Sequence, residues 1–457
     1  MPRLIKPPKF DILEMPKIWN EIIEKEKDKM GDYIEISHSI DEKGRYIPYD
    51  KFQYTVPRHL NKDLAWKIVK SNRLNKRINL FKFGDDATIG NFILTPNIQK
   101  ALSETDRNTT TAVLQWMTQN IGEEHYLKYL LNDLIEDESI SSSQLEGAAT
   151  TTLDAKRILK KKRGPRTNDE KMVIGNFNMM RYVWENRKKP LTIEFIKELH
   201  VKGVEGINDK QYSPGQFRIE TDNVVVVNYD DEIVHSPPKA DGIENRLQII
   251  IDWANSCHDD ANGKNYIHPL IKAIILHFCI GYEHPFKDGN GRVARALFYW
   301  FMFKNNYSAF RYIAISTLIK SAPKQYGMAY VRSETDDMDL TYFIEHQCRI
   351  VIRGIHKFKE TYEEAIINIQ KFDQWMWESG LLKKLTDKQR VLLNVAKSKI
   401  ANNFTATSVS SMLGCSYNTA AKNLQSLVEL KIFKARKCQR ETVYSMMSMK
   451  SIQENNF

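Results

Sequence analysis

The chain has 457 residues, 42% of them hydrophobic and 27% charged, and a net charge of +10 at pH 7, and its length favours two to four domains over one core. No window approaches eighteen consecutive apolar residues and the N-terminal stretch MPRLIKPPKFDILE has no apolar segment, so we expect a cytoplasmic protein with neither membrane span nor signal peptide. Five scattered cysteines, none in a CxxC pair, argue against a disulfide framework or a zinc site.

Residues 1–123 form an N-terminal region in which Pro-bounded segments mix with helical patterns. The stretch EISHSIDEKGRYIPY, residues 35–49, predicts a β-hairpin. We infer no chemistry from this region.

Residues 124–360 indicate a helical domain. Apolar residues recur at helical spacing from Glu124 onward around the polar run SISSS, and further helices are predicted over 169–187 and 191–203. Ser142 and Glu146 are four residues apart, hence on one face of a helix predicted over about 136–150, and Gly147 follows. On their own, a serine and a glutamate at this spacing indicate only a helix surface.

A different pattern interrupts the helices at GQFRIETDNVVVVNYDDEIVHSPP. Here the β-branched run Val224, Val225, Val226 and Val227 precedes a turn-like stretch, and Ile233 and Val234 follow before a Pro pair. This pattern predicts a β-hairpin over about 223–234.

The segment EHPFKDGNGRVAR, residues 283–295, lies between two predicted helices. Gly289, Asn290 and Gly291 form a loop that enters a helix N-terminus, where unpaired N–H groups and the helix dipole favour an anion. This arrangement predicts a phosphate cradle.

Four charged or titratable residues of the same segment suit phosphate chemistry. Arg292 and Arg295 can add charge-assisted hydrogen bonds to phosphate oxygens, and Asp288 can hold Mg²⁺ between two phosphates. His284 is the group in the segment suited to accept a proton near neutral pH. No strand is predicted before this segment, which argues against a Rossmann dinucleotide site, and the Lys-Ser/Thr of a Walker A loop is absent. The remaining alternative to a phosphate site is a polar turn between two helices.

Residues 361–385 are expected to be a helical linker, and residues 386–457 form a basic module with eleven Lys or Arg against four Asp or Glu. Two helices, a turn at Gly414, a longer helix over 417–431 and a two-stranded segment predict a winged helix-turn-helix domain. Four basic residues are candidates for contacts with DNA phosphates: Lys422, Lys434, Arg436 and Lys437. An equally plain interpretation is that they form a solvated surface without a nucleic-acid partner.

The segment from His284 to Arg295 resembles the signature of the Fic family, His-x-Phe-x-Asp/Glu-Gly-Asn-Gly-Arg-x-x-Arg, at every fixed position. The resemblance covers roughly residues 124–350 and implies a mainly α fold: a helical Fic core with a β-hairpin flap, here followed by the winged-helix domain. It also implies AMP transfer from ATP to a Ser, Thr or Tyr hydroxyl of a protein, including the chain itself, with release of pyrophosphate.

The resemblance implies a role for each residue of the motif. His284 would deprotonate the attacking hydroxyl, Asp288 would hold Mg²⁺, and the Gly289–Gly291 loop would stabilise charge at the α-phosphate, while Arg292 and Arg295 would grip the outer phosphates. The hairpin over 223–234 would be a flap that pairs with an extended stretch of the target, although a plain structural hairpin stays open.

Ser142, Glu146 and Gly147 are similar to the family's inhibitory motif, Ser/Thr-x-x-x-Glu-Gly/Asn. In that interpretation Glu146 pairs with Arg295 in the place of the γ-phosphate and restrains ATP binding.

Two other functions stay open. The same scaffold could remove AMP, with Glu146 as the base for water, or transfer another phosphate-bearing group. The other open function is regulation of transcription, in which the basic module binds DNA and the Fic core acts as a sensor. The sequence leaves a homodimer open and names no protein target.

Overall fold

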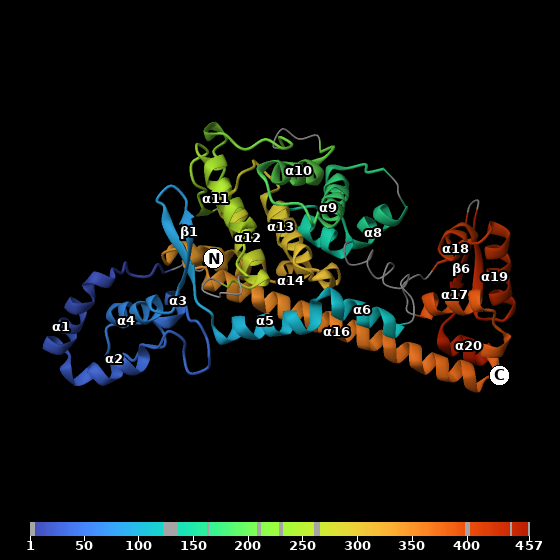
Figure 1. The fold of residues 1–457 in the computed structure, drawn as a ribbon, viewed down its shortest axis with the longest axis horizontal. Helices are drawn as coiled ribbons and strands as arrows, with labels where there is room; N and C mark the ends of the chain where they lie inside the picture. The colour runs from blue at the N-terminus through green and yellow to red at the C-terminus, as the bar shows by residue number, and fades with distance from the viewer. Residues whose placement is uncertain are drawn as a thin grey trace. The chain divides into compact units, whose positions relative to one another are not determined.

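The computed structural model describes residues 5–121, 136–161, 164–207, 212–227, 232–259, 266–397, 403–438 and 441–455. They fall into two compact units, one within Met1–Thr111 and Ile135–Ile355 and the other within Ala112–Leu134 and His356–Phe457. Helices dominate the described part of the chain and its strands form three two-stranded pairs, which confirms the predicted mainly α fold (Figure 1). Within the same residues, no helix is long and apolar enough to cross a bilayer.

The N-terminal part of the first unit is a small helical cluster around the fully buried Trp66. Its α-helices are amphipathic, and α4 begins where the Asn61 side chain accepts hydrogen bonds from the backbone N–H groups of Asp63 and Leu64. The α-helices are α1 (Met15–Lys25), α2 (Met30–Ile36), α3 (Tyr49–Phe52) and α4 (Lys62–Leu74), with 3₁₀ turns at Ile12–Glu14 and Lys27–Lys29.

The hairpin predicted over residues 35–49 is wrong. Its turn exists, because the Asp41 carboxylate accepts hydrogen bonds from the N–H groups of Lys43 and Arg45. Its flanks do not pair, since the preceding residues belong to α2 and Pro48, which has no N–H, leads into α3. The hairpin of this region is instead formed by β1 (Ile78–Phe83) and β2 (Thr88–Phe92).

Two consecutive helices form the centre of the first unit, α12 (Pro269–Glu283) and α13 (Asn290–Lys304), which lie side by side (Figure 1). Residues 270–280 and 292–303 are buried throughout, as expected of helices that are hydrophobic on every face. Against them pack α9 (Asn168–Glu185), α10 (Ile193–Val204) and α11 (Ile243–Asn255). The unit also holds α5 (Pro96–Thr109), α8 (Thr152–Lys161), α14 (Ile315–Lys320), α15 (Pro323–Thr335), the start of α16 (Thr341–Glu378) and 3₁₀ turns at Glu220–Asp222 and Ser308–Tyr312.

The predicted hairpin before α11 is present but shorter than expected. β3 (Val226–Val227) pairs with β4 (Ile233–His235) in antiparallel fashion, and the predicted turn over 228–231 lies outside the described residues. Val224 and Val225 precede the paired residues, because Asn223 adopts a left-handed conformation (φ 48°) that ends the preceding 3₁₀ turn.

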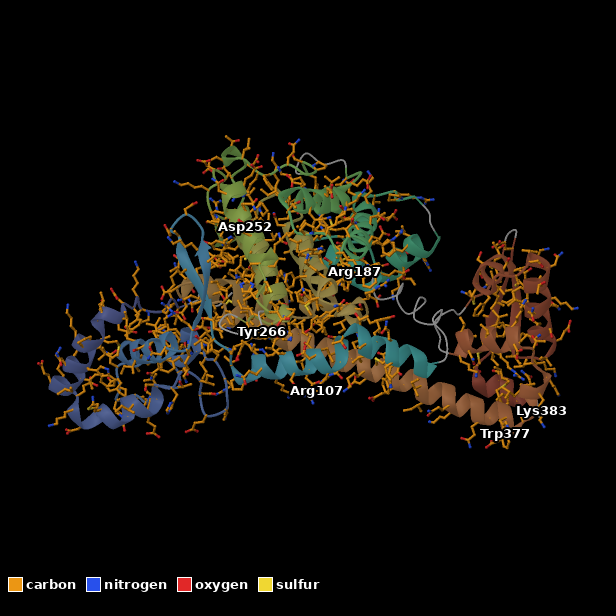
Figure 2. The ribbon with its side chains drawn as sticks, in the orientation of Figure 1. Arg107, Arg187, Asp252, Tyr266, Trp377 and Lys383 are labelled. Carbon is orange, nitrogen blue, oxygen red and sulfur yellow. The ribbon has the colours of Figure 1, made fainter. Side chains whose placement is uncertain are left out.

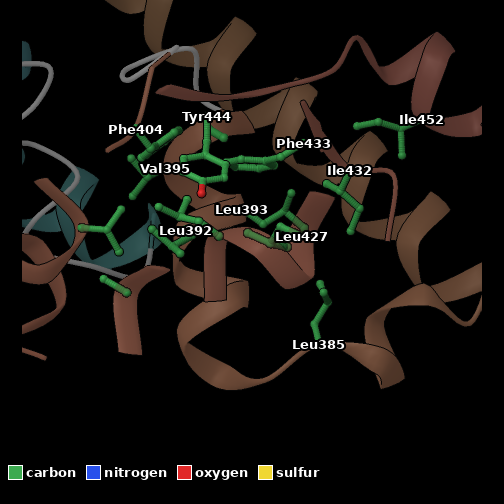
Figure 3. Close-up of a cluster of buried hydrophobic side chains, with 14 of the residues drawn as sticks. Leu385, Leu392, Leu393, Val395, Phe404, Leu427, Ile432, Phe433, Tyr444 and Ile452 are labelled. Carbon is green, nitrogen blue, oxygen red and sulfur yellow. The ribbon is translucent and has the colours of Figure 1, made fainter. Parts of the chain in front are cut away.

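The second unit has its own hydrophobic core, to which Leu392, Leu427 and Phe433 contribute (Figure 3). Its elements follow the predicted order of helices and two strands; that they form a winged-helix domain stays a prediction. They are α6 (Thr111–Ile121), the end of α16, a 3₁₀ turn at Leu381–Lys384, α17 (Asp387–Lys397), α18 (Ala406–Leu413), α19 (Tyr417–Glu429), β5 (Phe433–Cys438), β6 (Glu441–Met446) and α20 (Met449–Asn455). In both units charged side chains lie on exposed faces, among them Arg107, Asp252 and Lys383 (Figure 2).

Candidate active site

The segment from Glu283 to Arg295 connects the end of α12 with the start of α13. His284 caps α12 in a left-handed conformation (φ 46°, ψ 55°), and its N–H donates to Ile280 O at 3.0 Å. Gly289 precedes α13 with φ 82°, a conformation that favours glycine. The first N–H groups of a helix have no partner within it, so the loop brings an anion-binding helix start close to the histidine.

The loop is held closed by two of its own residues. The Asn290 side chain accepts from Phe286 N at 2.9 Å and donates to Phe286 O at 2.8 Å. Phe286 is fully buried and stacks on the His200 ring with centroids 3.9 Å apart. The Asn290 side chain is thus used within the loop, which leaves its backbone N–H as the group available to a ligand.

His200, which the sequence did not suggest, links α10 to this loop. Its Nδ1 accepts a hydrogen bond from Gly215 N, so its Nε2 carries the proton and donates to Asp288 O at 3.0 Å. Burial lowers the pKa of His200 to about 4, which keeps the ring neutral in this role. The ring therefore fixes the backbone of the residue that precedes Gly289.

His284 has the protonation and orientation of a general base. Burial lowers the pKa of His284 to about 4, so the imidazole is neutral at physiological pH. Its Nδ1 lies 3.0 Å from Gly281 O and must carry the proton to donate to that carbonyl. Nε2 is then the nitrogen that can accept a proton.

Arg295 is held by two residues of the serine-rich segment. Its Nε donates to Ser142 Oγ at 2.9 Å, and its Nη2 donates to Glu146 Oε1 at 2.7 Å. Arg295 is 1% exposed and the Glu146 side chain is 21% exposed, so the arginine is shielded from solvent while the carboxylate is only partly so. Burial disfavours charge on Glu146, but Arg295, with help from Arg292 and His284, lowers the pKa of its carboxyl below the ordinary value.

The Glu146 carboxylate also covers the start of α13. A Cβ built on Gly291 would overlap Glu146 Oε1, so the carboxylate lies directly against this glycine. The sequence-predicted residues Ser142, Glu146, Gly291 and Arg295 are thus brought together at one place.

The helix that carries Ser142 is described over residues 136–145, and the predicted extension to 150 is wrong. It ends because Gly147 adopts φ 96°, and Glu146 lies in the turn just before it. The run Ser139, Ser141, Ser142 and Ser143, which reads as a polar surface, is buried.

Glu138 anchors this helix, a role that the sequence did not reveal. Its carboxylate accepts from Tyr299 Oη at 2.9 Å and from Ser316 N at 2.9 Å and Ser316 Oγ at 2.5 Å. Burial raises the pKa of Glu138 despite these hydrogen bonds. The segment with Glu146 is therefore fastened to α13 and α14 by a buried polar contact.

Arg292 is 1% exposed and is only partly satisfied by the protein. Its Nη1 donates to Gly203 O at 2.8 Å, while its Nε and Nη2 have no hydrogen-bond partner among the described residues. Buried guanidinium N–H groups without an acceptor are costly, so this side chain is suited to an anionic ligand.

Arg218 joins the end of α12 to the flap, the hairpin of β3 and β4. Its Nε donates to His284 O at 2.8 Å, and its Nη2 donates to Glu283 O and to Pro238 O, which follows β4. A single arginine before a β-branched run gave no signal in the sequence.

His235 on β4 fastens the flap from the other side. Its Nδ1 lies 2.8 Å from Glu334 Oε2 and its Nε2 lies 2.8 Å from Tyr282 O, so both nitrogens face acceptors. Burial by itself lowers the pKa of His235, but Glu334 and the Tyr282 carbonyl outweigh it and raise the pKa. A protonated ring can therefore donate to both acceptors in this geometry.

Asp288 is the candidate cation ligand. Its Oδ1 accepts a hydrogen bond from Gly289 N, which aims the carboxylate along the loop. No group of three or more acidic, His or Cys side chains that could hold a metal occurs among the described residues. One carboxylate beside a phosphate site fits a Mg²⁺ that takes its other ligands from phosphates and water.

Other predicted residues lie on exposed parts of their elements. Val225 and Val227 are 43% and 49% exposed, whereas Val224 and Val226 on the other face are half-buried. In the second unit, four cationic side chains on α19 and β5 are exposed; they are Lys422, Lys434, Arg436 and Lys437.

Comparison with solved structures gives partial matches. A Fic family protein from Desulfovibrio desulfuricans is 18% identical, with a TM-score of 0.48 over 78% of this chain and 97% of that chain. Residues 134–508 of Fic-1 from C. elegans are 18% identical, with a TM-score of 0.43 over 58% of this chain and 70% of that chain.

Comparison with curated proteins gives matches to part of each relative. The chain is 28% identical over 158 residues to the protein adenylyltransferase Fic of Drosophila willistoni, which is 34% of this chain and 29% of that protein. It is 36% identical over 63 residues to the protein of the same name from Nematostella vectensis, 14% of each chain. The chain thus spans less than a third of the length of these relatives. The Fic/DOC family model matches residues 190–302. Residues 190–302, which contain the whole motif from His284 to Arg295, are thus the part of the chain that is similar to the Fic/DOC family.

Proposed function

We propose that this protein transfers AMP from ATP to a hydroxyl group of a protein, including its own. The observation that carries the proposal is the placement of a neutral His284 at one end of a loop whose other end is the start of a buried helix. The hydroxyl oxygen would attack the α-phosphorus, the bond from that phosphorus to the bridging oxygen would break, and pyrophosphate would leave. His284 Nε2 would take the hydroxyl proton.

The nucleotide would be bound mainly through its phosphates. The Gly289–Gly291 loop would donate N–H groups to the α-phosphate, and the unsatisfied N–H groups of Arg292 suit the outer phosphates. Asp288 would hold Mg²⁺, which supplies charge neutralisation between neighbouring phosphates when it is bound. ATP as the nucleotide is supported by the relatives that are named protein adenylyltransferases.

Glu146 would restrain the reaction. Its carboxylate forms the ion pair with Arg295 and lies against Gly291, where phosphate oxygens would otherwise bind. This position supports inhibition in the same chain. Its ion pair with Arg295 engages the carboxylate, which favours restraint over activation of a water for removal of AMP.

The flap would align the target. Its outward-facing Val225 and Val227 offer an exposed strand for pairing with an extended segment, and Arg218 ties its base to His284 O.

The experiment that tests the reaction class incubates Glu146→Gly and Glu146→Gly/His284→Ala with α-labelled and, separately, γ-labelled ATP. Label from the α position alone, present in the first variant and absent in the second, is the expected result; γ-label incorporation contradicts AMP transfer.

A second candidate function is DNA binding by the second unit. The observation in its favour is that Lys434, Arg436 and Lys437 on β5 are all exposed, as is Lys422 on α19. Cations on a helix and a neighbouring strand are suited to phosphate contacts along a duplex. A salt-dependent shift of duplex DNA tests this function independently of the Fic domain.

A further inference from the structure

The hairpin of β1 and β2, which lies outside residues 190–302, reaches the end of α12. A Cβ built on Gly84, in the turn between the two strands, would overlap the Tyr282 hydroxyl. The buried Phe83 ring also lies against the Tyr282 ring, with centroids 5.9 Å apart. The turn of this hairpin therefore contacts α12 two residues before His284.

Asp85, the next residue of this turn, connects the hairpin to the segment that follows the flap. Its Oδ2 accepts from Lys239 N at 2.9 Å, and its Oδ1 accepts from Arg246 Nη1 at 3.2 Å. Arg246 in turn donates from Nη2 to Lys239 O at 2.6 Å and from Nε to Glu283 Oε2 at 2.8 Å. The N–H and the carbonyl of Lys239 are thus both held, and the arginine that holds the carbonyl is joined to the residue before His284.

The hairpin that carries Asp85 is itself fixed at its base and on one side. At its base, the backbone of Asn91 forms two hydrogen bonds with the segment between α15 and α16. On its side, the Phe81 ring lies 5.3 Å from the ring of Trp253 on α11, the helix that also carries Arg246. Asp85 therefore extends from a support whose position does not depend on the flap.

The flap needs such a support because its own strands are short. Two residues of β3 pair with β4. An isolated two-stranded hairpin is at best marginally stable in water, so the contacts at the ends of the flap decide its direction. The buried Arg218 holds the segment after β4 at Pro238 O, and Asp85, whose side chain is 41% exposed, holds it one residue later.

We propose that Asp85 is a positioning residue for the target protein. Through Lys239 it fixes the direction of the flap relative to His284, so that the hairpin of β1 and β2 takes part in aligning the hydroxyl group. This inference rests on the proposed function. The Asp85 hydrogen bonds go to Lys239 and Arg246 rather than to the proposed nucleotide site, so their loss should affect transfer to the hydroxyl and not the binding of ATP.

The test uses the full chain in the Glu146→Gly background, with Asp85→Ala, Asp85→Asn and, as the control, Asp86→Ala. Asp86 is the next residue of the same turn and is exposed, and within the described residues it forms no hydrogen bond or ion pair. Two quantities are measured. One is the amide hydrogen exchange of residues 232–240, and the other is the initial rate of α-label incorporation into the chain as a function of ATP concentration.

We expect faster exchange in Asp85→Ala, because the end of the flap loses one of its supports. Its maximal rate should be about fivefold lower, the scale of one partly exposed charged contact, at an unchanged half-saturating ATP concentration. Asp85→Asn keeps one oxygen acceptor and should lie between Asp85→Ala and the parent. Asp86→Ala should match the parent in both quantities.

Equal exchange or an equal maximal rate in Asp85→Ala and Asp86→Ala overturns the inference. So does a loss of rate that a higher ATP concentration restores, because Asp85 would then support nucleotide binding. Should the Glu146→Gly parent incorporate no label, the proposed function fails. In that case faster exchange in Asp85→Ala still supports Asp85 as the residue that holds the flap, and unchanged exchange removes that role as well.

Discussion

Arg295 Nη2 donates to Glu146 Oε1 at 2.7 Å, although the two residues are 149 positions apart in the chain. The carboxylate is bound to the same guanidinium that the motif offers to phosphate, and it lies against Gly291. Any loosening of the segment that carries Glu146 should therefore change access to the site.

Replacing Glu138 should loosen that segment from a distance. Glu138→Ala leaves the N–H and O–H donors of Ser316 without the carboxylate acceptor, which should lower the free energy of unfolding by about 3 kcal/mol and raise basal AMP transfer. Asp137→Ala is the control, since its ion pair with Lys156 is partly exposed and should contribute less than about 1 kcal/mol. Denaturant unfolding and label incorporation measure both quantities. Equal effects of the two variants would show that Glu138 is no anchor.

Replacing Arg218 should slow transfer without weakening nucleotide binding. Arg218→Lys keeps the charge but replaces the guanidinium fork, whose Nε and Nη2 reach separate carbonyl groups, with a single nitrogen, so His284 and the flap lose their common support. In the Glu146→Gly background we expect transfer to fall about tenfold, as a displaced base permits, with the dissociation constant of ATP unchanged. Arg181→Lys, whose side chain is 59% exposed, serves as the control. A matching rise in the ATP dissociation constant contradicts a positioning role.

His235 should make the flap sensitive to pH. A protonated ring donates to both Glu334 and Tyr282 O, and its pKa is raised in the folded protein. The stabilisation is therefore fully present below the ordinary histidine pKa of 6.5 and is lost as pH rises through the higher folded value.

The measurement is the difference in thermal midpoint between wild type and His235→Gln across that window. We expect wild type to lose its advantage with rising pH, because the ring then gives up the proton that it donates to Glu334. His59→Gln is the control, because His59 pairs with Asp32 at an exposed position. An advantage that grows with pH would mean that the neutral ring is the stabilising form.

The second unit should bind duplex DNA with a strong dependence on salt. The variant combines alanine substitutions of the four exposed cations, Lys422, Lys434, Arg436 and Lys437. It should bind DNA more weakly, and the slope of log affinity against log salt should fall in magnitude by about 0.9 for each phosphate that is no longer neutralised. The control substitutes four exposed lysines of the first unit, Lys25, Lys27, Lys43 and Lys62. A slope equal in wild type and both variants excludes a role for the four cations of the second unit.

The sequence was sufficient to predict residues whose roles are local or carried by a motif. The loop over 284–289 lies between α12 and α13, and Asn290 already begins the second helix, because the glycine and the helix-forming flanks are adjacent in the chain. The helix predicted over 191–203 is present as α10, and it begins where the Thr192 side chain accepts from the N–H of Phe195, three residues on. The pairing of Glu146 with Arg295 was predicted from the resemblance, and the spacing of Ser142 and Glu146 alone would not have indicated it.

The residues that were missed act over long sequence distances. Glu138 contacts Ser316, 178 positions on, and Arg218 donates to backbone carbonyls, which carry no sequence signal. The wrong hairpin over 35–49 shows the same limit, because the turn at Asp41 is local while strand pairing depends on distant packing.

The most direct test of the account compares the initial rate of α-label incorporation in wild type, Glu146→Gly and Arg295→Ala at matched protein and ATP concentrations. Glu146→Gly removes the carboxylate and leaves Arg295 free for the γ-phosphate, so its rate should rise at least about tenfold, the scale of one buried charged contact. Arg295→Ala removes both the restraint and the group that binds phosphate, and it should stay inactive. Equal rates for wild type and Glu146→Gly would contradict the claim that the Glu146–Arg295 pair restrains this site.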